Sequence, residues 1–119
     1  MKTWEQYIDD QKSICKKIEV EFIPADIEFR IGLADNVLTD LIPINGLRYN
    51  IEGIGTGWFI WSGEKFSTDD NFFKPHCVKH LTELKPEIIK YLGLPPGHRF
   101  LIDNKGYEDI WFDETLLIP

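Results

Sequence analysis

Histidine and cysteine side chains provide the nearest approach to a metal-binding or catalytic pattern. His76 and His80 are four residues apart, so on a helix both imidazoles would lie on one face and could bind one zinc ion. Zinc needs three or four ligands, but Cys77 falls off that face and His98 stands in a distant segment. Cys77 and His80 could also form a nucleophile and base, but no third residue orients them. We therefore expect no metal, no cofactor and no catalytic residue.

Two other patterns invite an enzymatic interpretation that their neighbours do not support. Gly53, Gly55 and Gly57 could form a phosphate loop, but such a loop needs a helix after it, and a strand-like segment follows here. Ser62 could be a nucleophile on a sharp turn, but that pattern requires a glycine two residues earlier, where Ile60 stands. The sequence therefore favours binding over catalysis.

Acidic and aromatic residues alternate near the C-terminus. A strand over residues 107–113 would place Tyr107, Asp109, Trp111 and Asp113 on one face. A face that mixes acids with aromatics suits contact with a basic partner protein, whereas the alternative is that Trp111 belongs to the core and the acids surround it. The residues that we expect to contact such a partner are Glu64, Asp69, Asp70, Asp109, Trp111, Asp113 and Glu114.

Two alternatives remain open for the apolar run at residues 58–61. One is a small-molecule-binding domain or cytosolic enzyme with a concave pocket near Trp58, Trp61 and His76. The other is a self-associating structural module that uses this tryptophan-rich strand as its interface.

Composition and charge limit the class of protein. A chain of 119 residues, 43% of them hydrophobic, predicts a single domain over residues 1–119 with a core that needs no disulfide. The net charge of -7 disfavours nucleic-acid binding, because phosphates would be repelled, and it can steer a basic protein partner. No apolar run predicts a membrane span or signal peptide, and the two cysteines have the pattern of reduced thiols, so we expect a cytoplasmic protein.

The elements that would position these residues can be predicted from periodicity and capping. Residues 3–18 have the pattern of an amphipathic helix, with a capping box formed by Thr3 and Gln6. Alternation over residues 27–33 predicts a half-buried strand. Asn45-Gly46 predicts a hairpin turn between arms at 37–44 and 47–52.

The second half predicts a central strand, two short helices and a hairpin. Trp58-Phe59-Ile60-Trp61 is apolar on both faces, as in a covered central strand. Pro75 and Pro86 suit the first turns of short helices at 75–85 and 86–92. The hairpin pairs residues 99–103 with 107–113. We therefore expect the α+β class, with a mainly antiparallel sheet, an N-terminal helix and a central pair of short helices.

The order of several short motifs resembles a known family. The motifs are Gly57-Trp58, Ser62-Gly63-Glu64, Asp69-Asp70-Asn71-Phe72, Pro86-Glu87-Ile88-Ile89, Tyr91-Leu92, residues 95–100 and residues 107–113. Together they resemble the thirty-third immunity-protein family of bacterial polymorphic toxin systems over residues 57–117, whereas residues 1–56 match less clearly. The resemblance implies a cytoplasmic, non-enzymatic protein that binds and neutralises a cognate protein toxin encoded beside it. The acidic surplus fits a basic toxin, such as a nuclease.

Overall fold

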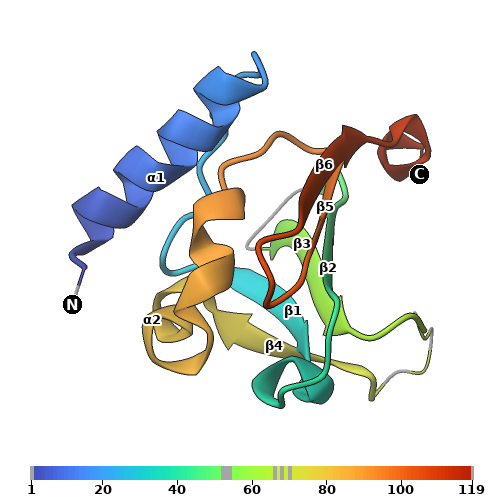
Figure 1. Ribbon diagram of the computed structural model, residues 1–119. Coiled ribbons are helices and arrows are strands. Elements are labelled where there is room, and N and C mark those ends of the chain that lie inside the picture. The colour runs from blue at the N-terminus through green and yellow to red at the C-terminus, as the bar shows by residue number, and fades with distance from the viewer. Residues whose placement is uncertain (1, 52–54, 66, 68, 70, 119) are drawn as a thin grey trace.

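A computed structural model describes residues 2–51, 55–65, 67, 69 and 71–118 (Figure 1). The predictions made for Gly53 and Asp70 therefore lie outside the described residues. The helices and strands are α1 (Trp4–Lys17), β1 (Arg30–Ala34), β2 (Ile44–Arg48), β3 (Gly55–Ser62), β4 (Phe73–Cys77), α2 (Leu81–Leu84), β5 (His98–Ile102) and β6 (Glu108–Phe112). Short 3-10 helices occupy Asp35–Leu38, Val78–His80, Pro86–Tyr91 and Glu114–Leu117.

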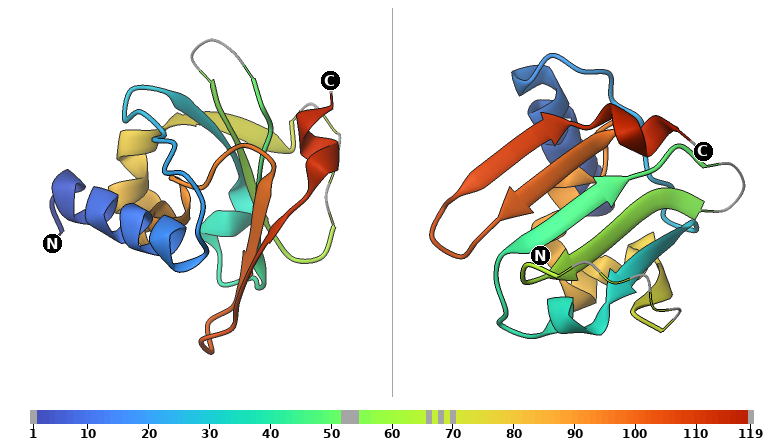
Figure 2. Two further views of the ribbon diagram at one scale, coloured as in Figure 1. Left: turned by 90° about the horizontal axis from the view of Figure 1, so that it is seen from above. Right: turned by 90° about the vertical axis from the view of Figure 1, so that its right-hand side faces the viewer.

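The strands form one sheet in the order β4-β1-β3-β2-β5-β6, in which β1 and β3 are parallel and the other neighbours antiparallel. The helices α1 and α2 lie on one side of this sheet, and the C-terminal turn lies on the other (Figure 2). We call these two sides the helix face and the open face. The prediction of an α+β fold with a mainly antiparallel sheet is confirmed.

The N-terminal helix begins where its capping box predicts. The Thr3 hydroxyl accepts a hydrogen bond from the Gln6 amide at 3.2 Å, and the Gln6 side-chain oxygen accepts one from the Thr3 amide at 2.8 Å. This reciprocal pair satisfies two N–H groups that would otherwise lack partners at a helix start.

α1 packs tightly against the segment that follows α2. Gln11 is fully buried, and its amide donates to the Ile89 carbonyl at 3.0 Å. The Cys15 thiol donates to the Gly93 carbonyl at 3.3 Å. A Cβ at Gly93 would lie 2.7 Å from the Phe22 ring, so only glycine allows this close approach.

A buried arginine forms hydrogen bonds with segments from both halves of the chain. Arg48 is 4% exposed, and its guanidinium lies 5.8 Å from the Trp58 ring centroid. Burial lowers the pKa of Arg48 to about 10, which leaves the group charged at neutral pH. Carbonyl oxygens rather than a carboxylate accept its hydrogen bonds, and they belong to Ile23, Pro24, Thr56, Leu92 and Leu94. Five charge-assisted bonds of this kind offset much of the cost of removing the cation from water.

The hairpin predicted at Asn45-Gly46 is wrong. Both residues lie inside β2, and the hairpin instead joins β2 to β3. Gly46 serves packing rather than turning, because a Cβ there would lie 2.2 Å from the Phe100 ring. The Asn45 amide donates to the Gly63 carbonyl at 2.7 Å, so its side chain joins neighbouring strands.

The helix predicted over residues 75–85 is also partly wrong. Residues 73–77 form the edge strand β4, and α2 covers only Leu81–Leu84. Pro75 is compatible with a strand here because an edge position does not require its missing N–H. His76 and His80 consequently do not share one helix. The second short helix is present as the 3-10 segment Pro86–Tyr91.

The central strand and the C-terminal hairpin are confirmed. β3 has β1 on one side and β2 on the other, and Trp58 and Trp61 are 1% and 4% exposed. Trp58 packs on the helix face, where it meets Phe100, and Trp61 packs on the open face, where it meets Phe73. The strand predicted at 27–33 is present but runs from Arg30 to Ala34.

Candidate functional site

The C-terminal hairpin is built on a turn that Asp103 closes. The Asp103 amide donates to the Tyr107 carbonyl at 3.3 Å, and the Asp103 carboxylate accepts from the amides of Lys105 and Tyr107 at 2.8 and 3.0 Å. Gly106 supplies the positive φ of 89° that this turn needs. The turn therefore fixes the positions of side chains along β6.

Trp111 is held at the surface of the open face by an arginine. It is 37% exposed, and the Arg99 guanidinium lies 5.5 Å from its ring centroid. The same guanidinium donates to Asp113 at 3.1 Å. Asp109 lies two residues from Trp111 in β6 and is also exposed on the open face. The structure thus brings Asp109, Trp111 and Asp113 together, as the alternation predicts.

Asp113 has a structural task that its neighbours Asp109 and Glu114 lack. Its carboxylate accepts hydrogen bonds from the Thr115 hydroxyl and amide at 2.6 and 3.1 Å, which caps the C-terminal turn. These bonds from Thr115, followed by the bond from Arg99, lower the pKa of Asp113. Asp109 and Glu114 are exposed and form no ion pair within the described residues. Their charges therefore remain available to a partner.

Glu64 and Asp69 lie at the opposite end of the sheet from Asp113. Ser62 at the end of β3 is aligned through β2 and β5 with Glu108 at the start of β6. Glu64 follows Ser62, whereas Asp113 follows the other end of β6. Asp69 lies in the connection to β4, where its carboxylate accepts from the Asn71 amide at 2.9 Å. Glu64 and Asp69 are therefore separated from Asp113 along the strands, and from Asp109 by the two strands β2 and β5 that lie between β3 and β6.

The residues of the alternative pocket do not face one another. Trp58 points to the helix face, where its indole N–H donates to the Leu92 carbonyl at 3.0 Å. Trp61 points to the open face, where its ring meets Phe73 edge-on at 6.3 Å. His76 lies in the edge strand β4, beside Ile31 of β1. Of three cavities in the described residues, one has Trp58 in its lining, and none of the three is lined by Trp61 or His76.

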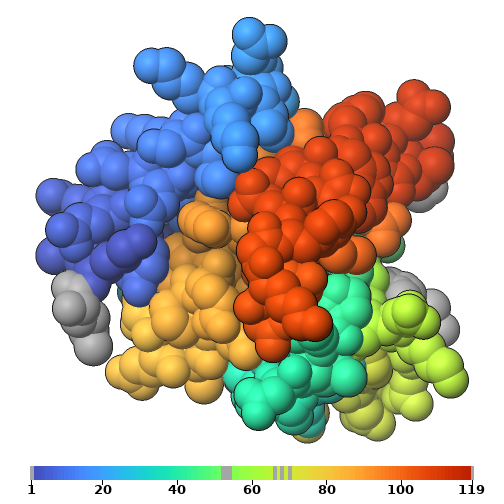
Figure 3. Space-filling view, in the orientation of Figure 1, coloured from blue at the N-terminus to red at the C-terminus, as the bar shows by residue number. Residues whose placement is uncertain are grey.

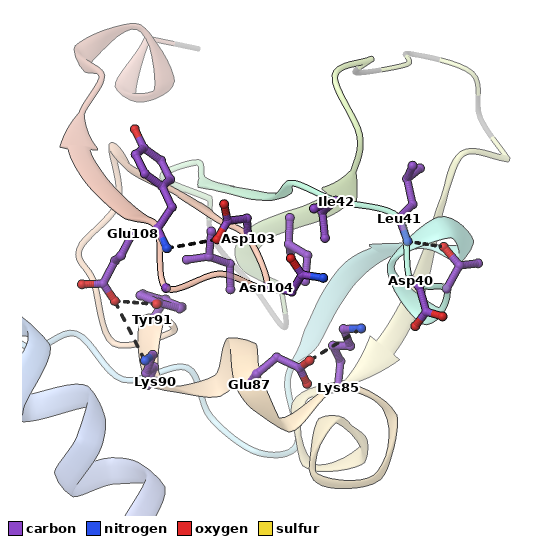
Figure 4. A pocket seen from close by; sticks show the side chains of 15 residues that line it. Asp40, Leu41, Ile42, Lys85, Glu87, Lys90, Tyr91, Asp103, Asn104 and Glu108 are labelled. Atoms are coloured by element: carbon purple, nitrogen blue, oxygen red, sulfur yellow. Dashed lines mark hydrogen bonds and ion pairs between the residues drawn. The ribbon is translucent and has the colours of Figure 1, made fainter.

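A cleft of about 550 Å³ lies beside the hairpin on the helix side of β6 (Figure 4). Its walls are the connection 39–42, the hairpin turn and the segment 85–91. Three exposed apolar side chains border it, those of Leu41, Ile42 and Tyr107, which are 48%, 37% and 53% exposed.

Charged side chains line the same cleft, with more acids than bases. Lys85 pairs with Glu87 at 3.6 Å, and Lys90 lies 3.9 Å from Glu108. Asp40 and Asp103, which also line the cleft, have no cationic partner among the described side chains. The cleft could therefore bind a basic group, with apolar contacts at its rim.

Glu108 lines the cleft and also contacts α1. The Tyr91 hydroxyl donates to its carboxylate at 2.5 Å, and Lys17 lies 3.4 Å away. The hydrogen bond from Tyr91, with the ion pairs to Lys17 and Lys90, lowers the pKa of Glu108. Burial, followed by the nearby carboxylate, raises the pKa of Tyr91 far above its usual range. Tyr91 therefore keeps its proton at neutral pH, donates a hydrogen bond to Glu108 and cannot act as a base.

The sequence analysis missed this cleft because it treated residues 37–44 as one arm of a hairpin, at a sheet edge or irregular because of Pro43, rather than as the wall of a cleft. Three large apolar residues, Leu38, Leu41 and Ile42, are exposed in this segment. Leu41 and Ile42 stand directly before Pro43, and Leu38 lies five residues before it. Polar residues also interrupt the run, so these neighbours could have indicated an exposed connection.

No three His, Cys, Asp or Glu side chains in the described ranges could hold one metal ion. Across the same residues, no helix has the length and apolar character that crossing a bilayer requires.

A model of the Imm33-like domain matches residues 10–113. The match begins within α1 and ends just after β6, so it includes most of the N-terminal half in which the motifs were less clear. Searches of curated proteins and of solved structures gave no match.

Proposed function

We propose, because this chain belongs to the Imm33-like domain family, that it acts as an immunity protein that binds and neutralises a cognate bacterial toxin. The family match over residues 10–113 is the observation that carries this proposal. Neutralisation on this view needs only a stable complex that covers the toxin's working surface, so the protein itself catalyses nothing. It would act in the cytoplasm, where the toxin would otherwise do its damage.

The surface that we propose for toxin contact is the β6 border of the open face, along which lie Asp109, Trp111 and Glu114. Trp111 is the type of residue that contributes most to protein interfaces, and its contact with Arg99 fixes the ring before binding. An aromatic side chain that is already held in place loses less conformational freedom when a partner covers it. The two neighbouring acids favour a basic toxin surface.

Asp113 belongs to the same surface through its ion pair with Arg99, but a change there would also remove the cap of the C-terminal turn. Glu64 and Asp69 remain proposed contacts of a second group, at the other end of the sheet from Asp113. Asp70, which lies outside the described residues, remains a proposed contact on the sequence alone. A stable complex would bury about 1,600 Å² in total, which can include more than one such group.

The test is protection of cells from the toxin domain encoded beside this protein. We expect cells that express both proteins to survive and the two proteins to copurify. Asp109→Lys should weaken the complex about tenfold, equivalent to about 1.4 kcal/mol, because it places a cation against a basic surface. Asp9→Lys is the matched control, since Asp9 is an exposed acid of α1 on the other side of the sheet.

Two outcomes would count against the proposal at different levels. If an active, folded toxin domain neither binds nor is neutralised, the immunity function is wrong. If Asp109→Lys and Asp9→Lys bind equally well, the immunity function stands and the contact surface lies elsewhere.

A further inference from the structure

The sheet has two free edges, and they differ in how well their outward-facing backbone groups can pair with another strand. β4 and β6 are the outermost strands, so each has only one neighbour, and one side of each backbone faces away from the sheet (Figure 2). Such an edge can pair with a strand of another protein when its N–H and C=O groups are accessible.

Hydrogen bonding to β5 identifies the outward-facing residues of β6. The Asp113 amide donates to the Gly97 carbonyl at 2.7 Å, and the Asp103 amide donates to the Tyr107 carbonyl at 3.3 Å. Hydrogen-bonded pairs in an antiparallel ladder occur at every second residue. The backbone groups of residues 109 and 111 therefore form hydrogen bonds with β5. The backbone groups of Glu108, Ile110 and Phe112 point away from β5, towards the free side of the strand.

The same reasoning shows that β4 is a poor edge for pairing. The Val78 amide donates to the Phe29 carbonyl at 3.0 Å, in register with the β1–β4 ladder. The outward-facing residues are therefore 73, 75 and 77, and the central one is Pro75, which has no N–H. Proline and lysine are common means of protecting an edge, and Lys74 stands beside Pro75. β6 contains neither residue type.

We propose that β6 is the docking strand, to which an extended, basic segment of the toxin adds as a seventh strand of the sheet. This inference rests on the proposed function and specifies how the toxin is held. Main-chain hydrogen bonds at residues 108, 110 and 112 supply affinity, and the flanking side chains select the partner segment.

Charge and side-chain alternation define the chemistry of that segment. Residues 106–118 contain four acids and no lysine or arginine. Lys17 and Lys90 pair with Glu108 and Arg99 pairs with Asp113, so the unpaired charges along this edge are the negative ones of Asp109 and Glu114. Asp109 has no ion pair among the described residues, and it faces the same side as Trp111. A Lys or Arg of the partner therefore lies beside Asp109 on the open face. On the helix face, an apolar residue lies beside Phe112, which is 53% exposed.

A second copy of this chain fits the edge less well. Each copy carries a net charge of -7, and pairing two β6 strands would bring two lysine- and arginine-free acidic segments together. Like charges across neighbouring strands are destabilising. A basic partner segment removes this repulsion, so charge complementarity favours the toxin over self-pairing.

Amide hydrogen exchange tests the inference directly. The probe is the purified toxin domain encoded beside this protein, mixed with the intact chain and followed by residue-resolved NMR. We expect the amides of Glu108, Ile110 and Phe112 to exchange at least about tenfold more slowly in the complex, because each gains a hydrogen bond. The outward amides of Phe73 and Cys77 in β4 are the internal control and should not change.

A backbone substitution provides an independent test. Ile110→Pro removes the central outward N–H and so gives β6 the feature that Pro75 gives β4. Ile110→Ala is the matched control, because it also shortens the half-buried side chain but keeps the N–H. With both variants confirmed as folded by thermal unfolding, Ile110→Pro should bind the toxin domain at least about tenfold more weakly than Ile110→Ala.

The possible outcomes distinguish a failure of strand addition at β6 from a failure of the proposed immunity function. A complex that forms and protects cells while the three β6 amides exchange as in the free protein would overturn strand addition alone. Protection of those amides in the free protein at high concentration would assign the edge to a second copy instead. Failure to form any complex would overturn the immunity function, and this inference with it.

Discussion

The carboxylate of Glu108 joins three parts of the molecule at residue scale. It accepts a hydrogen bond from Tyr91 and lies close to Lys17 of α1 and to Lys90. All three contacts stabilise its charged form, and hydrogen bonds to charged groups are stronger than neutral ones. One side chain therefore links β6 to α1 and to the 3-10 segment that contains Tyr91.

The lowered pKa of Glu108 predicts a loss of stability in acid. A carboxyl group whose folded-state pKa lies below its unfolded value stabilises the fold above the unfolded value, and this contribution disappears as pH falls through the folded pKa. Glu108→Gln should therefore be less stable than the natural chain at about pH 7, and this difference should shrink below about pH 4. Urea unfolding across this pH range measures the effect.

Glu87→Gln is the matched control for that experiment. Glu87 lines the same cleft and pairs with Lys85, but its side chain is 55% exposed, so its removal should change stability little at any pH. A constant stability difference between Glu108→Gln and the natural chain from neutral to acidic pH would show that the charge of Glu108 does not stabilise the fold.

At element scale, the docking of α1 depends on one glycine. Gly93→Ala would place a Cβ 2.7 Å from Phe22 and 3.0 Å from Gln11, so α1 and the chain after it would have to move. We expect a loss of about 1–3 kcal/mol in the free energy of unfolding, the usual cost of overpacking. Urea unfolding provides the measurement.

A double substitution shows whether that loss comes from the predicted clash. Phe22→Ala removes the ring that the new Cβ would meet, so the double variant should lose less stability than the sum of the two single changes. Additive losses would mean that Gly93 is needed for another reason, such as its backbone conformation.

Elements defined by local signals could be predicted from the sequence. The reciprocal cap of Thr3 and Gln6 places the start of α1, and Asp103 and Gly106 identify the C-terminal turn. Both signals act over fewer than five residues, so tertiary packing does not alter them. The alternation along β6 likewise places Asp109 and Trp111 on one face.

Elements that depend on distant neighbours could not be predicted in the same way. Asn45-Gly46 has the composition of a turn, but Gly46 is needed for contact with Phe100, more than 50 residues along the chain. Pro75 suits a helix start or an edge strand, and only its pairing with β1 decides between them. The cleft and the separation of Glu64 from Asp113 follow from strand order, which local patterns do not determine.

At the scale of the whole molecule, the net charge of -7 predicts salt-sensitive association. An acidic protein attracts a basic partner over a distance that mobile ions shorten, from about 10 Å at 0.1 M salt to about 3 Å at 1 M. The association rate constant with the toxin domain should therefore fall at least about tenfold over this range, with a much smaller change in the dissociation rate. Stopped-flow fluorescence of Trp111 and its neighbours can follow it.

An association rate that does not change with salt would remove electrostatic steering from the mechanism. A salt-dependent dissociation rate with constant association would instead locate the important charges inside the interface, where they act after contact.

The strand order also restricts how this protein can be divided. β1 and β2 come from the N-terminal half, yet β1 lies between β4 and β3, and β2 lies between β3 and β5 (Figure 3 shows the halves in contact). Without them, β5 and β6 would be the only adjacent strands left in the C-terminal half. During synthesis, nearly the whole chain must therefore leave the ribosome before the sheet can form. A recombinant protein that joins the N-terminal half of one relative to the C-terminal half of another would have to keep four strand pairings between the halves. Inheritance should accordingly preserve the two halves as one unit.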